Sequence, residues 1–147
     1  MQNLENIEVT GELYIEVRNE FNEIIDTRYV PNLVVTTGRN WIIGRMTGTP
    51  PVLMSHMAIG SNNTAPVVGQ TTLLNQLARV ALSSTNPAGN TITYTALFDA
   101  GVGTGSLVEA GIFNDPTAGT MLARTTFGVL TKAAGDVVTI TWTITIN

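Results

Sequence analysis

Hydrophobic and polar residues alternate strictly from Val137 to Ile146. One face of this run consists of Val138, Ile140, Trp142, Ile144 and Ile146, and the other of Val137, Thr139, Thr141, Thr143 and Thr145. Because successive side chains of a strand point to opposite sides of a sheet, the pattern predicts a half-buried β-strand. The threonine-rich face has no charged residue, whereas exposed strands are usually protected by charge. We therefore expect neighbouring protein to cover this face.

Seven further segments have the composition or alternation of strands, and turn-forming residues separate most of them. They are Glu8–Arg18, Glu23–Val30, Leu53–Ile59, Leu77–Ser83, Asn90–Phe98, Leu107–Phe113 and Met121–Val129. We expect Ser84–Gly89 to be a hairpin-like connection. Residues 38–46 form the one plausible helix, with Thr37 as its candidate N-cap and Trp41 docked on the sheet.

Eight short strands and one small helix predict an all-β fold, an antiparallel two-sheet sandwich. We favour a jelly-roll-like arrangement because a jelly roll uses eight strands, and an immunoglobulin-like sandwich is the alternative. The sequence contains no internal repeat and no sign of a second domain. Residues 1–147 are therefore expected to form a single β-sandwich domain with a charged, extended N-terminal segment.

Charge is scarce and unevenly placed. Charged residues make up 12% of the 147 residues, against roughly 25% in typical soluble domains. Seven of the 11 acidic residues lie within the first 26 positions, and only seven charges follow in the 101 residues from Thr47 onward. We expect the first segment to be solvated on one side and the rest to be packed or covered. A net charge of −4 with a single lysine, Lys132, argues against a nucleic-acid partner.

Several features of the sequence bear on the cellular compartment of the protein. The chain has no cysteine, which excludes disulfides and thiolate sites. Residues 1–8 do not resemble a signal peptide, and no apolar run approaches the ~20 residues that span a bilayer. We expect a protein that is made in a cytoplasm and stays soluble there until it assembles, with no membrane partner.

Candidate reactive residues are few. His56 is the only histidine, and no set of further ligands with metal-site spacing accompanies it. Gly101–Ser106 superficially resembles a phosphate loop, but the residues after it predict a strand rather than the helix that a nucleotide fingerprint needs. Asp99 and Asp115 lack the ladder of a calcium loop. We expect no catalytic, cofactor-binding or metal-binding residues.

Three charged residues interrupt otherwise apolar strands, namely Arg79, Glu109 and Arg124. A buried charge must be paired, because removing one partner of a buried ion pair costs roughly 3–5 kcal/mol. We therefore expect a structural ion pair between Glu109 and either Arg79 or Arg124, within one chain or between subunits.

Several segments resemble small virion proteins of tailed bacteriophages. They are Asn32–Ile42, Met54–Ser61, Asn63–Pro66, Leu73–Arg79, Val108–Asn114, Met121–Phe127 and the terminal Thr139–Ile144. The resemblance covers about residues 10–147. It implies a structural, tail-fibre-like or head-decoration role and no catalytic or cofactor residues.

The resemblance and the compact domain together predict a cement protein that decorates a phage head. We expect a homotrimer whose partner is the major capsid protein, with Arg18, Arg28, Arg39 and Arg45 as candidate capsid contacts. A baseplate, collar or short tail-appendage subunit is the alternative. A sugar-binding sandwich is a third class, but Trp41, Trp142, Tyr14, Tyr29 and Tyr94 form no stacking cluster that is evident in the sequence. An enzyme is the class we least expect.

Overall fold

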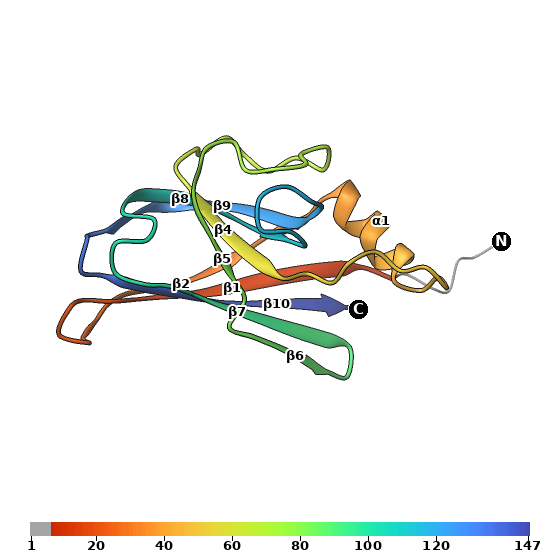
Figure 1. Ribbon diagram of the computed structural model, residues 1–147, viewed down its shortest axis with the longest axis horizontal. Coiled ribbons are helices and arrows are strands. Elements are labelled where there is room, and N and C mark those ends of the chain that lie inside the picture. The colour runs from red at the N-terminus through yellow and green to blue at the C-terminus, as the bar shows by residue number, and fades with distance from the viewer. Residues whose placement is uncertain (1–6) are drawn as a thin grey trace.

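Two antiparallel sheets of five strands each face one another in the computed structural model, which describes residues 7–147 (Figure 1). Sheet A has the order β2 (Ile24–Pro31), β1 (Val9–Arg18), β10 (Val137–Ile146), β7 (Thr91–Phe98) and β6 (Ser84–Ala88). Sheet B has the order β3 (Leu33–Val34), β9 (Met121–Lys132), β8 (Gly105–Phe113), β4 (His56–Gly60) and β5 (Gln76–Ala81). The predicted all-β, two-sheet sandwich is confirmed. Glu5, one of the N-terminal acids, lies outside the described residues.

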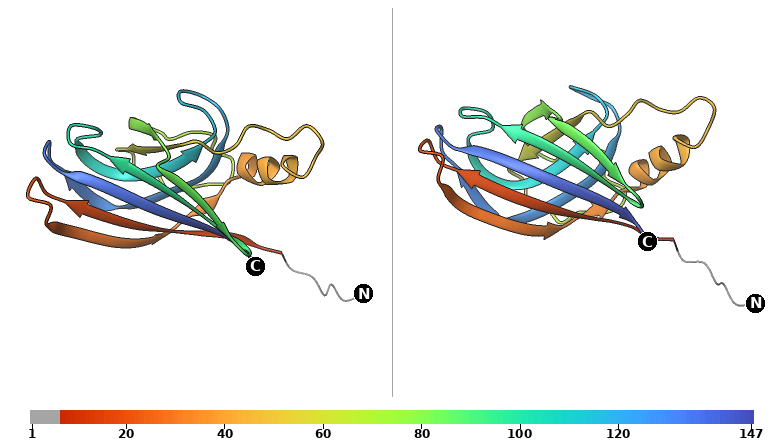
Figure 2. Two further views of the ribbon diagram at one scale, coloured as in Figure 1. Left: turned by 60° about the horizontal axis from the view of Figure 1, so that its bottom comes forward. Right: turned by 90° about the horizontal axis from the view of Figure 1, so that it is seen from below.

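The strands pair from the two ends of the chain inward. β1 pairs with β10, β3 with β9, β4 with β8, and β6 with β7, all antiparallel. Sequential antiparallel pairs, β1 with β2, β4 with β5 and β8 with β9, complete the two sheets. Helix α1 (Thr36–Gly44) lies at one end of the sandwich, opposite the β1–β2 hairpin (Figure 2).

The number of strands and the start of the helix differ from the predictions. Ser84–Ala88 was expected to be a connection, but it forms edge strand β6, and the turn that follows contains Gly89 at φ 61°. The helix begins at Thr36, with Val35 at the N-cap position and no side-chain cap. The prediction of Thr37 as N-cap is therefore wrong, because its hydroxyl donates instead to the carbonyl of Met121 on β9, at 2.9 Å.

The core lies between the two sheets. The alternating residues of β10 supply its centre, and Val138, Ile140, Trp142 and Ile144 are all at most 5% exposed. Residues from β1, β7, β8 and β9 pack against them, among them Leu13, Phe98, Leu107 and Leu122. Since burying one large aliphatic or aromatic side chain contributes roughly 1.5–3 kcal/mol, this core accounts for much of the stability of the fold.

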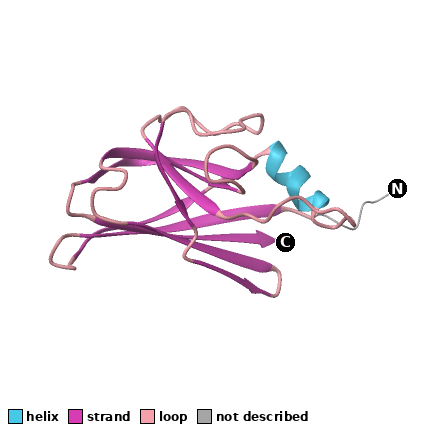
Figure 3. Cartoon of the chain, viewed as in Figure 1, coloured by secondary structure: helices cyan, strands magenta, loops and turns pink. Residues whose placement is uncertain are grey.

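The two sheets have differently covered outer faces. A long loop between β4 and β5, residues 61–75, crosses the outer face of sheet B (Figure 3). Leu73 of this loop belongs to a second, smaller cluster of buried residues, together with Val35, Ala58, Phe113 and Met121. The outer face of sheet A has no such cover within the described residues, and this asymmetry determines where binding surfaces lie.

Candidate functional site

Glu109 on β8 and Arg124 on β9 form a buried ion pair on the outer side of sheet B. Oε2 of Glu109 accepts hydrogen bonds from Nε of Arg124 at 3.0 Å and from Nη2 at 2.7 Å. Neither side chain has any exposed surface. The prediction that Glu109 pairs with one of the two arginines therefore holds for Arg124, within one chain.

The same pair fastens the loop of residues 61–75 to the sheet. The Glu109 carboxylate also accepts backbone N–H bonds from Asn62, Leu74 and Asn75, at 3.3, 3.1 and 2.8 Å. Arg124 donates in turn to the carbonyl oxygens of Asn62 and Thr64 and to Oε1 of Gln70. Both charges thus have their hydrogen-bonding capacity largely used by the loop, as buried charges require. The role of this centre is to hold the loop in place.

Arg79 does not take part in this pair. Its guanidinium lies 3.7 Å from the centroid of the Phe113 ring, in a cation–π arrangement. Nη1 donates to the carbonyls of Asp115 and Ala118, at 3.0 and 2.8 Å, and Nε donates to Oε1 of Gln76. Arg79 therefore holds the β8–β9 turn against β5.

The four candidate capsid-contact arginines do not form one patch. Arg18 lies next to the β1–β2 hairpin and pairs with Glu16 at 2.6 Å. Arg28 pairs with Asp26 and donates to the carbonyls of Gly128 and Val129 on β9, so it links the two sheets. Arg39 and Arg45 are exposed and lie within and directly after α1, at the opposite end of the molecule.

The outer face of sheet A is a broad surface of threonines. The register places Thr141, Thr143 and Thr145 of β10 opposite Thr95, Thr93 and Thr91 of β7. The hydroxyls of Thr93 and Thr143 share a hydrogen bond of 3.1 Å. We call the outward threonines of these two strands the threonine face. Its β10 half was predicted from alternation, whereas its β7 half follows from the strand register.

Two tyrosines lie at one border of the threonine face. Tyr14 of β1 is opposite Tyr29 of β2, and their ring centroids are 4.9 Å apart with the planes tilted by 40°. They line a shallow groove of about 420 Å³ together with Glu12 and threonines that include Thr141 and Thr143. Of the five aromatic residues considered in the sequence, Tyr14 and Tyr29 are therefore in contact with each other.

Strand β2 is the outer edge of sheet A, next to β1 only. Its exposed apolar residues are Ile24 at 51%, Ile25 at 53% and Tyr29 at 73% exposure, and Phe21 in the adjoining hairpin is 74% exposed. A sheet edge presents unpaired N–H and C=O groups, and natural proteins normally protect such an edge with charge, proline or a covering segment. Strand β2 carries these apolar side chains together with the Asp26–Arg28 ion pair, and Arg28 also reaches the carbonyls of Gly128 and Val129 on β9.

Other candidate chemistry is limited to local contacts. Nδ1 of His56 lies 2.8 Å from the hydroxyl of Ser55. Within residues 7–147, no group of three or more His, Cys, Asp or Glu side chains is placed to hold a metal. The glycine-rich segment of residues 101–105 leads into strand β8, as the sequence predicted. No helix among the described residues has the length and apolar character to cross a membrane.

A comparison with models of protein families, with curated proteins and with solved structures finds no match. The functional inference therefore depends on the surfaces described above. Of these surfaces, the β2 edge and the threonine face are the ones that are open in the isolated chain.

Proposed function

We propose that the chain is a non-enzymatic structural protein of a tailed-phage virion, and that it acts as a cement protein stabilising the head shell. The observation that carries this proposal is the β2 edge, where Ile24, Ile25 and Tyr29 are more than half exposed on a strand that pairs with β1 alone. An edge of this kind is a template for pairing with another chain. Such an edge suits a protein that functions within an assembly, because a neighbouring chain can pair with it.

The threonine face supports the same function. Its side chains are partly exposed, uncharged and set on the central strands of a sheet. Interface cores are poor in charged residues, so a face of this composition suits contact with protein. We propose a homotrimer in which these surfaces of sheet A contact neighbouring subunits or the major capsid protein.

The segments that resemble phage virion proteins fall mainly on sheet B and its loop. Val108–Asn114 and Met121–Phe127 contain Glu109 and Arg124, and Leu73–Arg79 contains two of the loop residues that Glu109 holds. The resemblance therefore covers the scaffold that gives the domain its shape.

The decisive experiment is localisation in the virion. An icosahedral reconstruction at subnanometre resolution should show the sandwich on the outer shell in hundreds of copies. A cement protein stabilises the shell only by binding the assembled lattice more tightly than free capsid subunits, so purified protein should bind empty shells and not free subunits. Density confined to the tail would reject the cement role and leave the baseplate, collar or tail-appendage role.

The Tyr14–Tyr29 groove favours binding of a neutral sugar as a second candidate function. Tyrosine rings provide a rigid face with a polar tip, and the surrounding threonine hydroxyls can both donate and accept hydrogen bonds. Titration of ¹⁵N-labelled protein with maltohexaose, cellohexaose or chitohexaose should then shift the amide signals of Tyr14 and Tyr29. The absence of any shift at millimolar sugar would remove this candidate for the glycans tested.

A further inference from the structure

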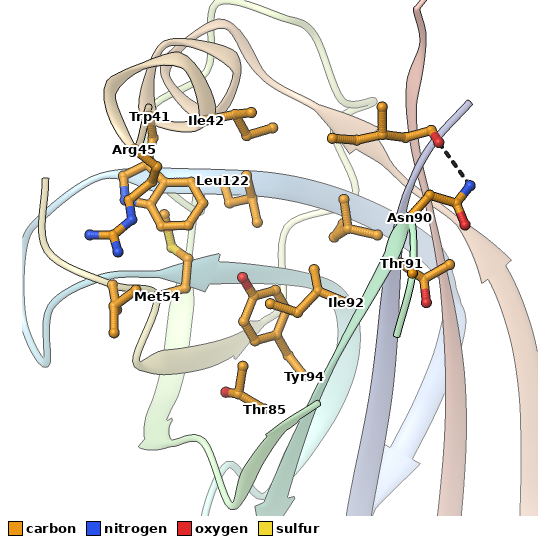
Figure 4. Close-up of a pocket in the computed structure, with 14 residues that line it drawn as sticks. Trp41, Ile42, Arg45, Met54, Thr85, Asn90, Thr91, Ile92, Tyr94 and Leu122 are labelled. Atoms are coloured by element: carbon orange, nitrogen blue, oxygen red, sulfur yellow. Dashed lines mark hydrogen bonds between the residues drawn. The ribbon is translucent and has the colours of Figure 1, made fainter. Parts of the chain in front are cut away.

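The helix end of the sandwich contains an apolar cavity of about 430 Å³ (Figure 4). Trp41 of α1, Ile92 of β7 and Leu122 of β9 form parts of its wall, so it lies where the two sheets and the helix meet. Pockets for small ligands typically measure roughly 300–1,000 Å³ and are mainly apolar with a few polar groups. The size and lining of this cavity fit that description, and none of the surfaces discussed above includes it.

A buried phenol is directed into this cavity. Tyr94 is 2% exposed, and its hydroxyl points into the cavity, toward Met54 and Leu122 (Figure 4). This hydroxyl makes no hydrogen bond to any residue in the range 7–147. The hydroxyl oxygen faces the open space of the cavity and is not sealed within the core, so its hydrogen-bonding capacity is available to a molecule that enters. A ligand with an acceptor atom would supply the missing partner.

A cation lies beside the same cavity. Arg45, directly after α1, is one of the lining residues, and its Nη1 donates to the carbonyl of Pro51 at 2.6 Å. A guanidinium has five N–H donors, so this contact leaves others available. Burial raises the pKa of Tyr94 to about 12, while the charge of Arg45 acts to lower it. The phenol is therefore a neutral donor at physiological pH, within the electrostatic influence of the arginine.

We propose that the cavity binds an aliphatic monocarboxylate of the fatty-acid class. The carboxylate accepts a hydrogen bond from Tyr94 and is paired with Arg45 at the rim, and the hydrocarbon chain lies along Ile92 and the other apolar side chains. An uncharged lipid would leave the cation unused, and a small inorganic anion would leave the apolar wall unused. The combination of one donor, one cation and a mostly apolar lining selects an amphipathic anion. This inference goes beyond the proposed virion role and is independent of it.

The two tryptophans make the test direct. Trp41 lines the cavity, whereas Trp142 is fully buried in the core between the sheets. In a Trp142→Phe background, Trp41 is the single tryptophan of the chain. Titration with decanoate, below its micelle concentration, should change the Trp41 emission in a saturable way. Decanol, with the same chain and no charge, should bind about tenfold more weakly, a difference that corresponds to one charge-assisted contact.

Conservative variants separate the two polar groups. Tyr94→Phe removes only the hydroxyl and Arg45→Gln only the charge, and each should weaken decanoate binding about tenfold. Arg45→Gln should leave decanol binding unchanged. Arg39→Gln is the matched control, since Arg39 is an exposed arginine of α1 that does not line the cavity. Circular dichroism before titration confirms that each variant is folded.

Three results would overturn the proposal. These are an unchanged Trp41 emission with both ligands, equal affinity for decanol and decanoate, and an equal effect of Arg39→Gln and Arg45→Gln. The second result would mean that the cavity takes apolar groups without selecting a carboxylate. Ile92→Trp provides an independent check, because a bulkier side chain in the wall should block decanoate binding in a protein that still folds.

Discussion

Glu109 and Arg124 meet through two hydrogen bonds, of 3.0 and 2.7 Å, at a point where neither side chain has exposed surface. The carboxylate also receives the backbone N–H groups of Leu74 and Asn75, which are far from it in the sequence. One carboxylate thus joins two strands to a loop. The pair is a structural centre whose loss should be felt in the loop as well as in global stability.

We first predict the effect of removing this carboxylate. Glu109→Ala should lower the free energy of unfolding by roughly 3–5 kcal/mol, because it leaves the Arg124 charge buried without its partner. Glu109→Gln should be milder, since the amide oxygen still accepts hydrogen bonds. Urea denaturation followed by circular dichroism measures both.

The matched control is Glu16→Ala, which breaks the partly exposed pair with Arg18. Surface pairs contribute about 0–1 kcal/mol, so this variant should remain close to the wild type. A Glu109→Ala protein that unfolds at the same urea concentration as Glu16→Ala would contradict the structural role of the buried pair.

A second prediction concerns Gly60, the last residue of β4. A Cβ at this position would overlap with the carbonyl oxygen of Asn75 and with Oε1 of Glu109. Gly60→Ala should therefore destabilise the fold by roughly 1–3 kcal/mol, as overpacking does, and should expose the loop of residues 61–75 to proteolysis. Gly69→Ala is the control, because that glycine of the same loop has open space around it. Equal protease sensitivity of the two variants would show that the contact at Gly60 is unimportant.

The predictable parts of the fold are those that local pattern specifies. β10 was predicted with its observed bounds, Val137–Ile146, because it alternates without an error and its apolar side is buried. β6 was missed because Ser84-Thr85-Asn86-Pro87 has the composition of a turn. It becomes a strand only through pairing with β7, and all five of its residues are exposed. Pairing with a neighbour, and not its own pattern, makes this segment a strand.

The candidate sites likewise include features that a local pattern of residues predicts and features that it does not. Burial of Glu109 was predicted because a charge interrupts an apolar strand. Its loop partners were not predicted, since backbone N–H groups occur at every non-proline residue and have no sequence signature. The Tyr14–Tyr29 contact depends on the register of two strands, and the apolar cavity depends on the distance between two sheets. Neither quantity is encoded in a local pattern of residues.

The third prediction is a pH dependence caused by Tyr94. Its folded-state pKa is about 12, above the ordinary value of 10.0, because burial penalises the phenolate. The stabilisation associated with the neutral phenol is therefore present below pH 10 and is lost as the pH rises from 10 through 12. The loss is on the order of 2–3 kcal/mol for a shift of this size.

Urea denaturation at pH 8, 10, 11 and 12 measures this loss. Tyr94→Phe has no group to ionise at this position, so its stability should fall less steeply above pH 10 than that of the wild type. Identical slopes in the two proteins would mean that another group causes the alkaline loss.

The last prediction concerns assembly through the β2 edge. Ile25→Lys places a charge on an edge strand at a side chain that is 53% exposed. A charge at an edge opposes pairing with another strand, and a substitution at an exposed site usually changes monomer stability by no more than about 0.5 kcal/mol. The variant should therefore fail to form the proposed homotrimer and to bind capsid shells as proposed, while keeping the unfolding midpoint of the isolated subunit. Size-exclusion chromatography with light scattering at micromolar concentration measures the oligomeric state.

Ile43→Lys is the matched control, because Ile43 is 64% exposed on α1, away from this edge. A wild-type chain that is monomeric both in solution and on the particle would contradict assembly, and a trimer that survives Ile25→Lys would move the interface away from β2.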